Sequence, residues 1–189
     1  MYCFLEGTEV STPKGPVKIE DLAPGDDVLT HDNRSVPGKW VGRQTVRTRF
    51  RMPDRVRPVR IAVGALGEGT PVRDLYVTPD HALFMDGYLI NASALVTGTS
   101  IRYAPLSQFG ESYVVYHIET EDHEVSVAEG VFAETFIDYG TRSAFDNYAE
   151  YDVPDGGGHA LQELPYPRLA AARLVPDGIR RRLGLYAVA

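Results

Sequence analysis

Short runs of β-branched and aromatic residues, interrupted by glycine and proline, dominate residues 1 to about 145 and constrain the fold more than any other feature. The chain contains 18 glycines and 13 prolines, and Pro24-Gly25-Asp26 has the composition of a turn between two such runs. In residues 45–52, apolar side chains fall on alternate positions and arginines on the others, as in a half-buried strand. Helical periodicity is scarce here. The sequence therefore predicts an all-β domain of many short strands.

The expected strands and the C-terminal part of the chain suggest one domain with an appendage. Further strands are expected at residues 17–19, 27–30, 39–41 and 75–77. Residues 146–167 are rich in proline, glycine and acidic residues, which is typical of a linker. Residues 169–175 suggest a short helix, and a basic segment follows at 179–183. We expect a domain over 3–145 and a linker and tail over 146–189, with the tail packed on the domain, bound to a partner or partly mobile.

The charge balance argues against general affinity for polyanions. The chain has 19 basic and 26 acidic residues and a net charge of −7, which opposes binding to nucleic acid or anionic membrane. Residues 34–60 are an exception, with nine basic residues and the single acid Asp54. A nucleic-acid surface at Arg47, Arg49 and Arg51 is the alternative to a strand edge protected by arginine, which we favour. No apolar run approaches the ~20 residues of a membrane-spanning helix, and no secretory leader is visible.

Cys3 is the single cysteine of the chain and begins the segment CFLEGTEV. It cannot form an internal disulfide, which leaves a buried spare thiol, an intermolecular link or a nucleophile. A thiolate is a strong nucleophile, and the nearest upstream carbonyl carbon is that of Tyr2. Attack on this carbon forms a cyclic intermediate and then a thioester, which frees the amino group of Cys3. The protein would have to distort the peptide bond, stabilise the oxyanion and protonate the leaving nitrogen.

Thr78 and His81 belong to the segment Thr-Pro-Asp-His, directly after the strand expected at residues 75–77. Pro79 disfavours a helix at Thr78, so a turn at the end of the strand can direct both side chains into one pocket. Histidine titrates near neutral pH and is suited to protonate a leaving amine. A turn-capping threonine and a core histidine would explain the same spacing. The pair becomes significant only together with Cys3.

Three segments, in this order and spacing, resemble sequence blocks of the Hint superfamily, which comprises inteins, hedgehog autoprocessing domains and bacterial intein-like domains. The second segment is residues 78–81, and the third is HEVSVAEGVFA at residues 123–133. The resemblance covers residues 3 to about 136. The matching residues of the first segment are Cys3, Phe4, Gly7, Thr8, Val10, Thr12, Gly15, Ile19, Glu20, Asp21, Leu22, Gly25, Asp26, Val28, Leu29 and Asp32.

The resemblance implies a horseshoe-like fold of curved antiparallel strands with pseudo-twofold halves, with Cys3 near the centre and an irregular, short-helical tail beyond it. Residues 1–2 would be the remnant of an upstream passenger, and the bond between Tyr2 and Cys3 the cleavage site. Cys3 would be the nucleophile, while Thr78 and His81 would attend the N-to-S acyl shift. His123, which precedes two strands around a glycine turn, would contribute to the same catalytic centre.

The chain departs from the intein pattern at the end of the third segment. Inteins place His-Asn or Ser-Asn there, and the asparagine cyclises to cut the downstream bond, whereas this chain has Glu134, Thr135 and Phe136. Full splicing is therefore not expected. Hedgehog domains also use only the first half of the chemistry and pass the acyl group to a sterol, but neither Asp54 nor Asp74 can be assigned the acceptor-activating role. Water, a small thiol or amine, or another chain remain open as acceptors.

A metal site competes with this interpretation of the histidines. If residues 117–123 form one strand, His117, Glu119, Glu121 and His123 share a face and offer zinc ligands. Strand residues two apart are ~6.5 to 7 Å apart, which is unfavourable for sharing one ion. A solvated or hydrogen-bonded face is favoured, and we predict neither a metal nor a cofactor.

Residues 116–142 look most like the bacterial Hint group found at the ends of larger, frequently secreted, proteins. This implies secretion as the C-terminal part of such a protein, although the compartment stays open. The predicted function is self-processing: a thioester forms before Cys3 and the upstream polypeptide is released or transferred. This is a single turnover in cis. The alternative is a processing-inactive interaction or secretion-associated module.

Overall fold

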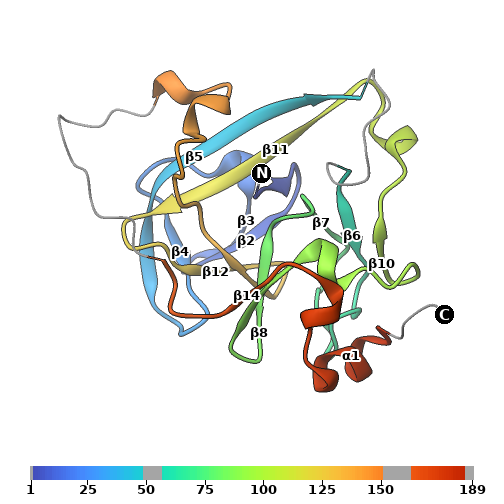
Figure 1. The fold of residues 1–189 in the computed structure, drawn as a ribbon. Coiled ribbons are helices and arrows are strands. Elements are labelled where there is room, and N and C mark those ends of the chain that lie inside the picture. Colours follow the sequence, from blue (N-terminus) through green and yellow to red (C-terminus); the bar gives the residue numbers. More distant parts are fainter. Residues whose placement is uncertain (1, 49–56, 151–162, 186–189) are drawn as a thin grey trace.

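The computed structural model describes residues 2–48, 57–150 and 163–185. Two seven-stranded sheets form most of it (Figure 1), which confirms the predicted all-β fold. The first sheet has the strand order β10-β6-β7-β1-β11-β5-β4 and contains β1 (Phe4–Leu5), β4 (Asp27–Leu29), β5 (Ser35–Arg47), β6 (Val59–Ile61), β7 (Leu75–Val77), β10 (Ile101–Tyr103) and β11 (Ser112–Thr120). The second has the order β14-β9-β8-β13-β12-β2-β3 and contains β2 (Glu9–Thr12), β3 (Gly15–Lys18), β8 (Ala82–Met85), β9 (Tyr88–Asn91), β12 (Val125–Ala128), β13 (Val131–Glu134) and β14 (Arg168–Leu169).

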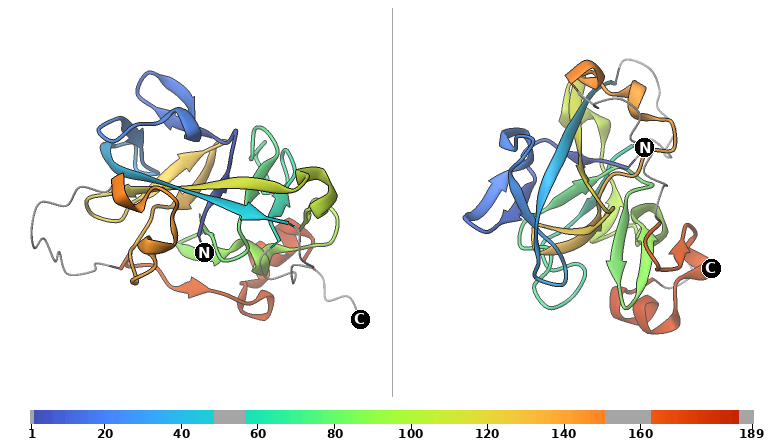
Figure 2. Two further views of the ribbon diagram at one scale, coloured as in Figure 1. Left: turned by 90° about the horizontal axis from the view of Figure 1, so that it is seen from above. Right: turned by 90° about the vertical axis from the view of Figure 1, so that its left-hand side faces the viewer.

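The longest strands, β5 and β11, pair antiparallel along the domain. Both views in Figure 2 show them running alongside each other. β5 joins the strands expected at 39–41 and 45–52 into one element, and residues 49–52 lie outside the described part of the chain. Gly42 lies in its middle because the Trp40 ring covers it: a Cβ there would be 2.5 Å from that ring. The glycine between the two expected strands therefore makes room for the Trp40 ring and does not mark a turn.

Part of the basic strand edge is covered and neutralised. Side chains of residues 146–150 accept hydrogen bonds from β5, where Asp146 binds the N–H of Thr45 at 2.7 Å. Arg43 lies 2.7 Å from Glu150. Ion pairs also hold Arg34, Lys39 and Arg60 to acidic partners. These contacts support a protected edge from Arg34 to Arg43. Arg47 is exposed at the end of β5, and Arg49 and Arg51 lie outside the described residues.

The C-terminal tail packs on the domain and corrects one prediction. Residues 169–175 are not a helix: β14 pairs in parallel with β9, and only a 3-10 turn follows. The backbone hydrogen bonds offered by the edge of β9 outweigh the weak preference of so short a segment for helix. The helix α1 (Asp177–Leu183) begins instead after Pro176 and ends at Gly184, whose φ of 68° suits a left-handed cap. The 3-10 helices are Ile19–Asp21, Ala92–Leu95, Leu106–Phe109, Arg142–Ala144, Tyr148–Glu150 and Ala172–Leu174.

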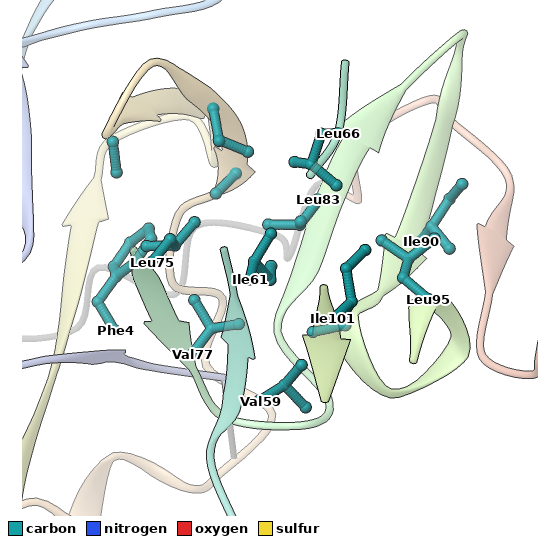
Figure 3. Packing of buried hydrophobic residues seen from close by; sticks show 14 of the residues in the cluster. Phe4, Val59, Ile61, Leu66, Leu75, Val77, Leu83, Ile90, Leu95 and Ile101 are labelled. Carbon is teal, nitrogen blue, oxygen red and sulfur yellow. The ribbon is translucent and has the colours of Figure 1, made fainter. Parts of the chain in front are cut away.

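Two hydrophobic clusters hold the sheets together. The larger joins strands of both sheets and the C-terminal segment; Figure 3 shows part of it, with Ile61, Leu83 and Ile101 fully buried. The smaller surrounds Cys3 with Trp40, Phe136 and other apolar side chains. Burial of these side chains is the main favourable contribution to folding. Within the described residues, no helix has the length and apolar character needed to span a membrane.

Candidate active site

Strand β1 carries Cys3 into the middle of the first sheet, between β7 and β11, where its neighbour Phe4 pairs with both strands. The N–H of Cys3 donates to the Oγ1 of Thr78 at 2.8 Å. The N–H of Thr78 donates in turn to the carbonyl oxygen of Cys3, also at 2.8 Å. The Cys3 nitrogen belongs to the Tyr2–Cys3 peptide bond. Thr78 therefore contacts the bond at which cleavage is predicted.

A tight turn joins Thr78 to His81, as the sequence predicts. The N–H of His81 donates to the carbonyl oxygen of Thr78 at 3.0 Å, which closes a four-residue turn between β7 and β8. Pro79 occupies the second position of this turn, where its fixed φ is favourable. This turn thus brings the side chains of Thr78 and His81 close to Cys3 and Phe4.

The His81 ring is fully buried and in contact with the Phe4 ring, at 4.3 Å between centroids. Its Nε2 lies 3.2 Å from the carbonyl oxygen of Glu134. A carbonyl can only accept, so Nε2 carries the hydrogen and Nδ1 presents a lone pair. Burial lowers the pKa of His81, while Glu134 and the backbone of Cys3 act to raise it. The ring is therefore neutral at pH 7 and able to accept a proton.

The thiol of Cys3 is fully buried among apolar side chains. Burial raises its pKa to about 12, because the thiolate loses its hydration there. Few molecules hold a thiolate at neutral pH. Attack by the sulfur therefore needs a base that removes the proton as the reaction proceeds.

His117 is the candidate for such a base. Phe4 pairs with Tyr116 in the antiparallel register, so one further residue places Cys3 opposite His117 on the same face. The His117 ring lies 5.0 Å from the His81 ring, and neither of its nitrogens hydrogen-bonds to a described residue. Its pKa lies well below the usual value, mainly through burial and then through His81 and His123. By this register, the neutral imidazole of His117, with one unprotonated nitrogen, lies on the same side of the sheet as Cys3.

The sequence did not identify His117 as a member of this site. Its alternation with Glu119 suggested a metal-binding face instead. His117 comes close to Cys3 through the pairing between β1 and β11. The two strands are more than a hundred residues apart in the chain, and neither segment contains a sequence pattern that indicates the other as its partner. His117 could have been found only by predicting that pairing.

His123 lies beyond the end of β11, in a left-handed backbone conformation with φ of 54°. Its ring is almost completely buried, and its Nε2 lies 3.9 Å from the Oε2 of Glu134. Glu134 thus contacts both histidines, His123 through its carboxylate and His81 through its backbone carbonyl. Thr78 and His81 contact Cys3 or its strand.

The strand that the metal hypothesis requires does not exist. β11 ends at Thr120, and its register shifts after Glu119. Glu119 instead binds Arg142, and Glu121 lies 3.3 Å from Lys39. Among the described residues, no three His, Cys, Asp or Glu side chains are grouped so as to hold a metal ion.

Glu134 and Thr135 occupy the place of the intein His-Asn or Ser-Asn pair, and both have structural partners. The Glu134 carboxylate is 2% exposed and binds Arg168, with Nη1 to Oε1 at 3.0 Å. It also accepts the N–H of Ala82 at 3.1 Å. The Oγ1 of Thr135 accepts the N–H of Glu124 at 2.7 Å. Neither side chain has the amide needed to cyclise.

A family model described as the Hint domain matches residues 2–140. The chain belongs to the Hint domain family. A comparison with curated protein sequences finds no match. Membership of the Hint family supports an autoprocessing type of function, and the family match ends before the C-terminal tail.

Solved structures agree with the fold. A variant of the MchDnaB-1 intein is 15% identical, with a TM-score of 0.50, and the match covers 71% of this chain and 99% of the intein. The gp41-1 intein is 16% identical at a TM-score of 0.50, covering 69% and 96%. A bacterial intein-like domain from Clostridium thermocellum is 18% identical at 0.49, covering 71% and 99%. At these identities the first two show a shared fold, the Hint intein fold.

Proposed function

We propose that this domain converts the Tyr2–Cys3 peptide bond to a thioester by an N-to-S acyl shift and so releases the polypeptide upstream of Cys3. The observation that carries the proposal is the hydrogen bond from the Cys3 N–H to Thr78. It attaches a polar side chain to the leaving nitrogen itself, in a part of the sheet where the neutral ring of His81 is also buried.

In the first step, His117 takes the proton of the Cys3 thiol while the sulfur attacks the carbonyl carbon of Tyr2. A C–S bond forms and the carbonyl oxygen becomes an oxyanion. Because burial raises the pKa of the thiol, a free thiolate is scarce, and a base that removes the proton during the attack avoids the need to form one first. The lowered pKa of His117 keeps its ring neutral at pH 7, before the reaction begins.

In the second step the C–N bond breaks, and its electron pair stays on the Cys3 nitrogen, which must gain a proton. The proton passes from His117 to the adjacent ring of His81, whose centroid is 5.0 Å away, and then to the nitrogen. Thr78 orients this nitrogen through its Oγ1. The net change is one proton moved from sulfur to nitrogen, and no cofactor is consumed.

The reaction is expected to stop at the upstream bond. Glu134 and Thr135 cannot form a succinimide, so the downstream bond is not cut by that route. The thioester would be resolved by water, a small thiol or amine, or another chain, and the upstream polypeptide is the substrate.

The test is intact-mass analysis of a folded passenger fused directly before Tyr2, with and without an added small thiol. We expect thiol-accelerated release of the passenger from the wild-type fusion and none from Cys3→Ala. An intact wild-type fusion under all conditions would overturn the proposal in favour of a processing-inactive interaction module.

A further inference from the structure

The C-terminal segment, residues 163–185, is built into the domain although the family match ends at residue 140. In Figure 1 it runs along the lower part of the molecule, where β14 extends the sheet beside β9. The N–H of Leu89 donates to the carbonyl of Pro167 at 3.0 Å. Val175, Ile179 and Leu183 are buried in the larger hydrophobic cluster. This anchoring fixes the backbone of β14 beside β9.

Arg168, the first residue of β14, is held against the site by Glu134. Both guanidinium nitrogens Nη1 and Nη2 bind the two carboxylate oxygens of Glu134, a paired geometry that fixes the plane of the guanidinium. The backbone carbonyl of the same glutamate binds His81. The guanidinium is therefore positioned by a residue that also positions a member of the candidate site.

The guanidinium of Arg168 lies over the ring of Tyr2, with its central carbon 5.7 Å from the ring centroid. Tyr2 carries the carbonyl that Cys3 would attack. Burial raises the pKa of the Tyr2 phenol, and Arg168 and Glu134 are the charged groups that act on it most strongly. A guanidinium over an aromatic face attracts the ring through its quadrupole, and an aliphatic side chain offers no such face.

We propose that Arg168, fixed by Glu134, forms a subsite for an aromatic side chain on the residue directly before Cys3, so that the C-terminal segment favours passengers that end in an aromatic residue. The effect of this subsite on processing rests on the proposed function. The bound ring would orient the attacked carbonyl toward the sulfur, and positioning of this kind favours the transition state. The subsite would make processing faster when the passenger ends in tyrosine or phenylalanine.

The kinetic test uses passenger fusions with Tyr, Phe or Leu at position 2, in the wild type, in Arg168→Lys and in the double variant Arg168→Gln with Glu134→Gln. Lysine keeps a charge beside Glu134 but lacks the planar group, and the double variant leaves no buried charge unpaired. We expect thiol-induced release from the wild type to be about three- to tenfold faster with Tyr or Phe than with Leu. The double variant should lose this preference, and Arg168→Lys, which keeps a cation but not the planar guanidinium, should show a smaller one. A wild type without preference, or a double variant that retains it in full, would overturn the subsite.

A second measurement does not depend on cleavage. In the uncleavable Cys3→Ala fusion, the Nε–Hε NMR resonance of Arg168 is identified by its loss in Arg168→Lys. Ring currents should shift this resonance when Tyr2 is replaced by Leu, and should leave it near its original position when Tyr2 is replaced by Phe. An unchanged resonance in Tyr2→Leu would contradict the subsite. Absence of release together with the expected shift would instead overturn the proposed function alone.

Discussion

The turn after β7 and the end of β13 meet at His81 but differ in chemical character. The turn presents Thr78 to the nitrogen of the Tyr2–Cys3 bond. The end of β13 presents Glu134, whose carboxylate binds Arg168, and Thr135, whose hydroxyl accepts a backbone N–H. We infer that the chain retains reactive groups for the upstream bond, while the downstream position has become a structural and binding element.

After the loss of the nucleophile, the largest effect is expected from His81→Ala, which removes the proposed proton donor of the upstream side. Release of the passenger should slow by about 10²- to 10⁴-fold, the usual contribution of a general acid. The measurement is the rate of thiol-induced release by intact mass, after circular dichroism has established that the variant is folded. His31→Ala is a matched control, since this histidine contacts Phe84 and Tyr166 away from Cys3. Equal rates for His81→Ala and wild type would remove His81 from the mechanism.

His117→Leu should separate activity from stability. The imidazole is buried with neither nitrogen hydrogen-bonded to a described residue, so leucine should raise the free energy of unfolding at pH 7 by about 1–3 kcal/mol. The release rate should fall at least about tenfold, because the base is lost. Urea denaturation and the release assay are compared on the same protein. A variant that is both less stable and fully active would mean that His117 serves only the core.

The same residue predicts an acid-side dependence of stability. The pKa of His117 is lowered in the folded state, so the unfolded chain binds the proton more strongly. The contribution of His117 to the free energy of unfolding is therefore fully present above about pH 6.5, the pKa of histidine in the unfolded chain, and is lost as the pH decreases below it. His81 acts in the same direction. Unfolding curves at pH 7 and pH 5 should differ less for His117→Leu than for wild type; an equal difference would contradict the assignment.

Cys3 predicts the opposite dependence on the alkaline side. Burial raises the pKa of its thiol from 9.0 to about 12, so the folded state holds the proton more strongly than the unfolded chain. The stabilisation is present below pH 9 and is lost as the pH rises toward 12. Denaturation at pH 8 and pH 10.5 should therefore show a smaller loss for Cys3→Ala than for wild type. Identical losses would indicate that the thiol is hydrated.

The smallest effect is expected from Thr135→Val, on the downstream side. It removes the hydrogen bond from the Glu124 N–H and should lower the free energy of unfolding by about 1–3 kcal/mol, as an unsatisfied buried donor remains. The release rate per folded molecule should not change. Thermal unfolding and the release assay check both parts. A strong loss of release in folded protein would show that the two sides are not separate.

Much of the fold and part of the site could be predicted from local patterns. The strands β4 and β7 and the Thr78–His81 turn follow from alternation and from proline, which act over a few residues. The tail was misjudged, because residues 169–175 were expected to be a helix and the edge of β9 instead recruits β14. Isolated short helices are weak, so an available sheet edge decides such cases.

By itself, the sequence determined an all-β domain, the place of the single thiol, and the absence of an asparagine where an intein would cut its downstream bond. Only the tertiary structure decided that His117 stands opposite Cys3 in the strand register and that Arg168 reaches Tyr2. Both depend on backbone pairing between distant strands, β1 with β11 and β9 with β14. Such pairing is stabilised by burial and hydrogen bonds summed over a whole sheet, and no single segment carries its signal.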